Sequence, residues 1–227
     1  MPMTAAQVLN PQHSSESREH MTPPDIVEAA REVLQVIELD PASTALANER
    51  ICARMFYTER ENGLAQRWRG RVFLNPPGGL CDAAGRPVIH ARRARRSRPD
   101  DPGCTISGSC GLAAPHEHEG VTSQAKVWWS KLAQHWRAGD VECAIFVGFS
   151  IEILQSTQAI DERLVTPMCC PFCVPRERVR FLSVTEDGVV VGNQPTHASV
   201  IVYLPPRYDI GSRRFESVFS KFGTVRL

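Results

Sequence analysis

The sequence predicts one α/β domain at residues 21–227, a mixed sheet with flanking helices. The chain has 227 residues, 42% hydrophobic and 22% charged, which suits one globular domain. Short apolar runs alternate along it with segments of helical periodicity. The longest apolar run, Cys143 to Phe149, is too short to cross a bilayer, and no secretion signal opens the chain. We therefore expect a cytoplasmic protein with no membrane association.

The clearest predicted helix begins at Thr22-Pro23-Pro24, where an N-cap residue precedes prolines that a first helical turn tolerates. Its apolar residues recur at helical spacing from Ile26 to Ile37. The pattern further predicts a strand over 36–39, a helix over 45–51, a strand over 71–74, a helix over 126–137, strands over 144–149, 189–191 and 199–204, and a last helix over 213–222.

Two segments lack an apolar period. Residues 1–20 are rich in proline and serine and are expected to form a loose arm. Residues 80–120 combine glycine, serine, proline and histidine, which indicates an insert or mobile loop. Six arginines fall between Arg86 and Arg98 with no acid among them. Such a run is most often a solvated loop, but on a protein that holds a polyanion it would contact phosphates.

The eight cysteines are expected to be reduced thiols, because the chain is long for a disulfide scaffold. The alternative is a structural zinc site. Its possible ligands are Cys104, Cys110, His116 and His118 in the insert, and Cys169, Cys170 and Cys173 beyond it. Only one C-x-x-C pair is present, whereas a strong zinc signature repeats the pair. We predict no metal.

The sharpest motif is Phe73-Leu74-Asn75-Pro76-Pro77, in which a strand delivers an amide and two prolines to the carboxyl edge of a sheet. The oxygen of the Asn75 carboxamide and the Pro76 carbonyl can accept the two N–H bonds of a planar amine. That arrangement favours a pyramidal nitrogen and aims its lone pair at a methyl donor. An ordinary strand-ending turn would use the same residue types.

Several spaced motifs follow one another in order along the chain. They are Thr22-Pro23-Pro24, Glu28 to Leu34, Glu38-Leu39-Asp40-Pro41-Ala42-Ser43, Ala47-Asn48, Asn62-Gly63-Leu64, Trp68-Arg69-Gly70 and Phe73 to Pro77, then Trp129 to Leu132, Pro175 to Phe181 and Phe215 to Val225. Together these motifs resemble the phage-type Dam family of DNA adenine methyltransferases. The likeness is dense from Thr22 to Pro77 and fainter beyond the insert.

The resemblance implies a Rossmann-like methyltransferase fold that uses S-adenosylmethionine to methylate the 6-amino group of adenine in DNA. It places the catalytic amine site at Asn75, Pro76 and Pro77. It places the cofactor at Asp40, Pro41, Ala42, Thr22 and Pro23. Asp40 could equally cap a helix, and Thr22 and Pro23 could simply start one. Transfer is expected to be direct, without a covalent enzyme intermediate.

Arg92, Arg93, Arg95 and Arg96 of the insert are the expected DNA contacts.

One departure from the family pattern concerns Gly78, where an aromatic ring that stacks on the flipped base is usual. Trp128, Trp129 and Phe149 are candidates to replace it, although such rings are more often core. The departure leaves alternatives open: a DNA-binding protein of this fold that lacks catalysis, methylation of an RNA adenine or a protein glutamine, or a metal-held nucleic-acid module in the insert.

Overall fold

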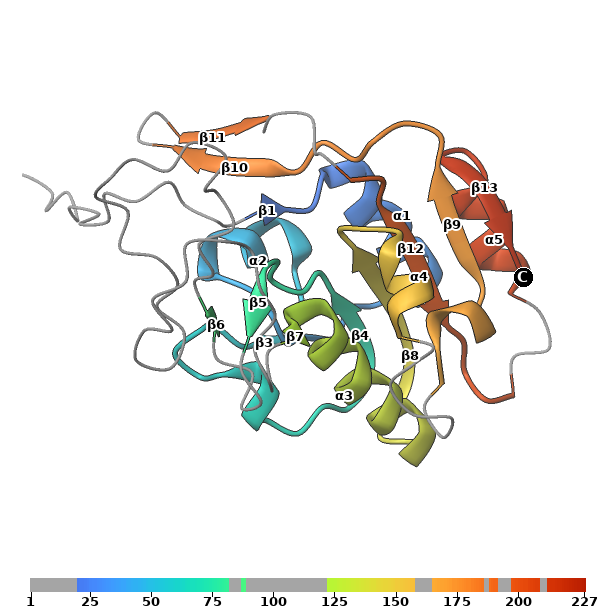
Figure 1. Ribbon diagram of the computed structural model, residues 1–227, viewed down its shortest axis with the longest axis horizontal. Helices are drawn as coiled ribbons and strands as arrows, with labels where there is room; N and C mark the ends of the chain where they lie inside the picture. The colour runs from blue at the N-terminus through green and yellow to red at the C-terminus, as the bar shows by residue number, and fades with distance from the viewer. Residues whose placement is uncertain are drawn as a thin grey trace, which may run out of the picture.

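A seven-stranded sheet lies at the centre of the computed structural model (Figure 1). The structure describes residues 20–81, 87–88, 122–157, 165–185, 188–191, 197–208 and 212–227. The central strands, in sheet order, are β13 (Gly223–Arg226), β9 (Phe172–Pro175), β12 (Val200–Leu204), β8 (Val141–Gly148), β4 (Gly70–Leu74), β2 (Leu39–Asp40) and β3 (Met55–Phe56). This confirms the predicted α/β class and mixed sheet.

The sheet is parallel on one side and mixed on the other. Strands β3, β2, β4 and β8 run parallel to one another. Strand β12 is antiparallel to β8, β9 is antiparallel to β12, and β13 is antiparallel to β9. It follows that β9 points the same way as β4 and β8, so that these strands end at one common edge, called the carboxyl edge below.

Helices cover both faces of the sheet. The first face carries α1 (Pro24–Leu34), α2 (Ala45–Ile51) and α5 (Arg213–Phe219), whose apolar residues share one core cluster with Phe73, Ile145 and Ile201 of the strands. The second face carries α3 (Gln124–Ala138) and α4 (Glu152–Ser156), which pack against Val72 and Phe146. In Figure 1, α3 and α4 lie in front of the sheet.

The boundary between β2 and β4 is where the chain changes direction across the sheet. After β2 the chain passes through α2 to β3 on one side, and it then returns to build β4 on the other side of β2. Open α/β sheets bind ligands at the carboxyl ends of the strands beside such a switch point. The topology therefore selects the ends of β2 and β4 as the place to look for a site.

Two small sheets border the carboxyl edge. Strand β1 (His20–Met21) pairs with β10 (Leu182–Thr185), which forms a hairpin with β11 (Gly188–Val191) at the top of Figure 1. Strand β5 (Leu80–Cys81) pairs with both β6 (Pro87–Val88) and β7 (Thr122–Ser123). In the parts of the chain that the structure describes, no helix has the length and apolar character needed to cross a membrane.

Some predicted boundaries were wrong. Helix α1 ends at Leu34 rather than Ile37, because Gln35 adopts φ +67°. The predicted strand over 36–39 is paired only at Leu39–Asp40. The last helix ends at Phe219, and the chain then turns into β13. The predicted strand over 189–191 is present, but it belongs to the hairpin sheet and not to the central one.

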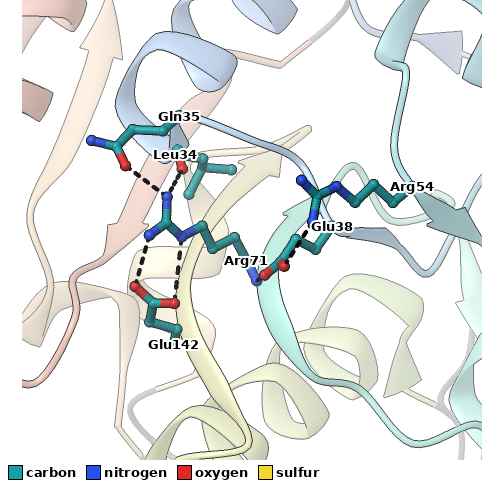
Figure 2. Close-up of polar contacts among 6 residues, drawn as sticks. All are labelled: Leu34, Gln35, Glu38, Arg54, Arg71 and Glu142. Carbon is teal, nitrogen blue, oxygen red and sulfur yellow. Dashed lines mark hydrogen bonds and ion pairs between the residues drawn. The ribbon is translucent and has the colours of Figure 1, made fainter.

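An arginine holds these elements together at the amino edge, opposite the switch-point ends (Figure 2). Arg71 donates from Nη1 to the Leu34 carbonyl at 2.9 Å and to Oε1 of Gln35 at 2.8 Å. Its Nε and Nη2 reach the two carboxylate oxygens of Glu142 at 3.4 and 3.2 Å. The β4–β8 register shifts between Gly70 and Arg71, so Glu142 is the extra residue of a bulge. One side chain thus ties the end of α1 to β4 and β8.

Candidate active site

The two strand ends at the switch point carry the two polar residues that the sequence selects. Leu39 pairs with Val72, so Asp40 lies level with Phe73, and Asn75 directly follows the end of β4. Neighbouring strands lie about 4.8 Å apart. Asp40 and Asn75 are therefore brought to the same stretch of the carboxyl edge, as the sequence predicts for a shared site.

Asp40 is a buried carboxyl group, only 1% exposed. Leu39 belongs to the α3 face, and successive side chains of a strand alternate, so Asp40 points to the α1 face. Burial raises the pKa of Asp40 to about 7, although hydrogen bonds from Ser43 and from the Ala42 amide oppose the rise. Oδ1 accepts from Ala42 N at 3.2 Å. Helix α2 is capped by Thr44, whose Oγ1 accepts from Ala47 N at 3.1 Å, so the capping alternative for Asp40 is wrong.

The amino end of α1 reaches the same edge from above. A short link joins α1 to β2, so the helix runs antiparallel to that strand and begins over the carboxyl edge. The Pro23 carbonyl accepts from Ile26 N and Val27 N, both at 3.1 Å. Thr22 is buried, and its Oγ1 has no hydrogen-bond partner among the described residues. A buried hydroxyl without a partner is costly, which makes Thr22 a candidate ligand-binding group.

Pro41 is covered by protein. A Cβ placed on Gly63 would lie 1.9 Å from the Pro41 carbonyl oxygen and 3.1 Å from the Trp128 ring. Gly63 is therefore required for the close approach of its 3₁₀ turn, Gly63–Ala65, to the end of β2. Ala42 remains half-buried. Among the predicted cofactor residues, Asp40 and Thr22 offer polar groups, whereas Pro41 shapes the backbone around them.

The Asn-Pro-Pro loop is anchored on both sides. Asn75 is half-buried and Pro76 is buried, while Pro77 and Gly78 are exposed. Gly79, at φ +92°, accepts from Gln124 N at 3.0 Å and so joins the loop to the start of α3. The β5–β7 pairing directly follows this contact. The loop that carries Asn75 is thus held between β4 and α3.

Of the three candidate stacking rings, two are enclosed in the core of the α3 face. Trp128 stacks on Trp68 with ring centroids 5.7 Å apart, and Trp129 meets Phe146 edge-on. Phe149 is partly buried and follows β8 at the carboxyl edge. Leu74 pairs with Phe146, so Phe149 stands beyond the strand end at about the level of Pro77. Of the three candidates, Phe149 is the one at the carboxyl edge, where its ring contacts those of Phe181 and His197.

Ser199 is a further candidate residue that the sequence did not indicate. It immediately precedes β12, is 2% exposed, and its Oγ has no hydrogen-bond partner among the described residues. Ile201 belongs to the α1 face, so alternation points Ser199 to that face as well. No local pattern in the sequence marks this serine. Only the pairing of Val200 with Gly148 brings it to the carboxyl edge.

The remaining predicted groups contribute no described site. Arg92, Arg93, Arg95 and Arg96 lie outside the described residues, as do the cysteines and histidines of the insert. Cys170 and Cys173 belong to core clusters on opposite faces of the sheet. Burial raises the pKa of Cys170 to about 12 and that of Cys173 to about 11. Within the described ranges, no group of three or more histidine, cysteine or acidic residues could hold a metal ion.

Comparison of the chain with protein-family models, with curated proteins and with solved structures finds no match.

Proposed function

We propose that the protein is an S-adenosylmethionine-dependent methyltransferase that acts on the 6-amino group of adenine in DNA. The observation that carries the proposal is the placement of Asn75-Pro76-Pro77 at the end of β4, beside Asp40 at the end of β2, at a topological switch point. The sequence motifs that resemble the phage-type Dam family fall on these positions.

Asn75 and Pro76 act on the amine. The lone pair of an exocyclic purine amine is delocalised into the ring, so the nitrogen is a poor nucleophile. Acceptance of its two N–H bonds by the Asn75 carboxamide oxygen and the Pro76 carbonyl favours the pyramidal form. The ring of Pro76 fixes its φ, and Pro77 restricts the ψ of Pro76 to the extended region, so the two prolines together limit the orientation of the Pro76 carbonyl. Because the loop is already anchored at Gly79, little ordering is needed when the base binds.

The buried polar groups fit the proposed cofactor. S-adenosylmethionine supplies an electrophilic methyl group on a sulfonium, together with an ammonium, a carboxylate and ribose hydroxyls. Asp40 would accept from the ammonium or a hydroxyl, and an adjacent cation would lower its pKa and keep it ionised. Oγ1 of Thr22, which has no hydrogen-bond partner among the described residues, lies just before the amino end of α1, where the helix dipole favours a carboxylate.

The proposal is tested by methyl transfer from labelled cofactor to DNA that lacks adenine methylation. We expect label in N6-methyladenine after nucleoside digestion. Asn75→Ala should abolish transfer and leave cofactor affinity within about twofold, because Asn75 contacts the amine and not the sulfonium. Calorimetric titration of cofactor into both proteins measures that division of roles. Label in RNA or in protein glutamine, with none in DNA, would contradict the proposed substrate.

A second function is favoured by Gly78, which replaces the expected stacking ring. A Cβ built on Gly78 meets no atom of the described residues within 4 Å, so these residues do not themselves require glycine at this position. A protein of this fold that binds DNA without methylating it would need no ring there. Such a protein would bind DNA and transfer no label even when cofactor is bound.

A further inference from the structure

The segment that links β9 to β10, residues 176–181, follows the carboxyl edge toward the candidate site. Strand β9 points the same way as β4, so Pro175 ends at the edge that carries Asn75. The chain then reaches Leu182, which pairs with Met21 of β1. Thr22 is the next residue after Met21. The β9–β10 segment therefore leads from the end of β9 to the strand beside Thr22.

Packing fixes this segment against the body of the protein. Val179 and Phe181 are buried in the core of the α1 face. The Phe181 ring lies 5.8 Å from that of Phe149, measured between centroids. At the start of the segment, Arg176 N donates to the Phe222 carbonyl at 2.9 Å. These contacts hold the backbone of residues 176–181 in place, so the side chains that point outward from it have defined positions along the edge.

Those outward side chains are mainly arginines. Arg176, Arg178 and Arg180 are exposed. From Arg178 onward the exposed arginines alternate with the buried Val179 and Phe181, and Glu177 is the one acid of the segment. Within the described part of the chain, neither Arg176 nor Arg180 forms an ion pair. A guanidinium forks onto phosphate oxygens with good geometry and remains charged at any physiological pH.

We propose that the β9–β10 segment binds the phosphate backbone of duplex DNA beside the adenine that enters the site. This inference rests on the proposed function, since it assigns a surface to that function's substrate. Phosphate contacts carry affinity without sequence choice. The segment would therefore position the duplex and would not select the target sequence.

The test compares full-length proteins that differ only in exposed arginines. The parent, Arg176→Ser/Arg180→Ser and the charge-retaining Arg176→Lys/Arg180→Lys are titrated against a fluorescein-labelled duplex of mixed sequence. Salt is varied from about 50 to about 200 mM, the range over which phosphate contacts dominate affinity. The matched control is Arg69→Ser/Arg137→Ser, because both residues are exposed and lie at the amino edge, just before β4 and near the end of α3.

We expect the serine pair at Arg176 and Arg180 to bind about tenfold more weakly at low salt and to lower the log–log salt slope by about two. The lysine pair should keep most of the affinity, and the control pair should match the parent. Unchanged affinity and slope in the serine pair would overturn the proposal. So would an effect limited to RNA of the same sequence.

Cofactor titration in every variant verifies that the site is folded. A parent that transfers no methyl group would refute the proposed function, whereas the salt slopes would still decide the surface. Conversely, an active parent whose serine pair binds DNA normally would refute only the surface.

Discussion

Two residues of the candidate site, Gly78 and Asp40, have measurable consequences on their own. Gly78 is exposed, and its φ lies outside the left-handed region that requires glycine. The neighbouring Gly79 does lie in that region, at φ +92°. The two glycines are therefore not equivalent, although they are adjacent and both lie in the Asn-Pro-Pro loop.

We predict that Gly78→Tyr leaves the free energy of unfolding within about 0.5 kcal/mol of the parent, as for an unconstrained surface position. The new ring should strengthen binding of DNA that carries an extrahelical adenine by several-fold, because base–aromatic stacking contributes about 1–3 kcal/mol. Fluorescence of 2-aminopurine at the target position would report that stacking. Gly79→Tyr is the control and should destabilise the protein, since its backbone is strained for a side chain. Equal losses of stability in Gly78→Tyr and Gly79→Tyr would contradict the conclusion that the backbone requires glycine only at position 79.

Asp40 should give the protein a pH-dependent stability. A carboxyl group whose pKa rises on folding stabilises the folded state while it is protonated, and this contribution is lost as the pH rises toward about 7. The free energy of unfolding of the parent should therefore fall by a few kcal/mol between about pH 4 and about pH 8, relative to Asp40→Asn. Urea unfolding at several pH values measures the difference.

The same variant tests the cofactor site. Asparagine keeps the size of the side chain but removes its charge, so Asp40→Asn should bind S-adenosylmethionine at least about tenfold more weakly. Cofactor binding to the parent should also release a proton near pH 6, because an adjacent cation favours the ionised carboxyl. Unchanged affinity in a folded Asp40→Asn protein would leave Asp40 a purely structural role.

At the scale of elements, the sequence predicted what hydrophobic periodicity and local motifs determine. The apolar period located α1, and the continuous apolar runs located β8 and β12. Strands β3, β9 and β13 were missed because they are short and show no alternation. Their pairing is set by partners far away in the chain, such as Val225 with Cys173. The ends of α1 and β2 were misplaced for a related reason, since Arg71 contacts the end of α1 across 37 residues of sequence.

We predict that Arg71→Ala lowers the free energy of unfolding by about 1–3 kcal/mol, because it removes hydrogen bonds to Leu34 and Gln35 and leaves Glu142 without its fork. Lysine should recover only part of that loss, because it lacks the planar fork. Urea denaturation measures the change, with the same dependence of the free energy of unfolding on urea concentration used for both proteins. Cofactor affinity should stay unchanged, because Arg71 lies at the amino edge. A loss of cofactor affinity at constant stability would contradict the expectation that the Arg71 contacts act on stability alone.

At the scale of the whole molecule, the site combines local motifs with a topology that no local pattern contains. The sequence identified Asn75 and Asp40 as residues at the ends of strands. If both strands are parallel, the two residues lie at the same edge of the sheet. Ser199 and the β9–β10 segment reach the same edge only because β12 and β9 are added beyond β8. Their positions could not be inferred without the strand order.

The described part of the insert ends at β6 and resumes at β7, and both strands pair with β5, which directly follows the Asn-Pro-Pro loop. Replacement of Arg92, Arg93, Arg95 and Arg96 by serine should weaken DNA binding at low salt and flatten the salt slope by about one for each lost phosphate contact. Target sequence, cofactor affinity and folding should not change, because phosphate contacts carry no sequence choice. Salt titrations, with Arg69→Ser/Arg137→Ser as the matched control, measure the effect. If DNA affinity and its salt slope equal those of the parent, the arginine-rich segment is a solvated loop, and DNA binding rests on Arg176 and Arg180.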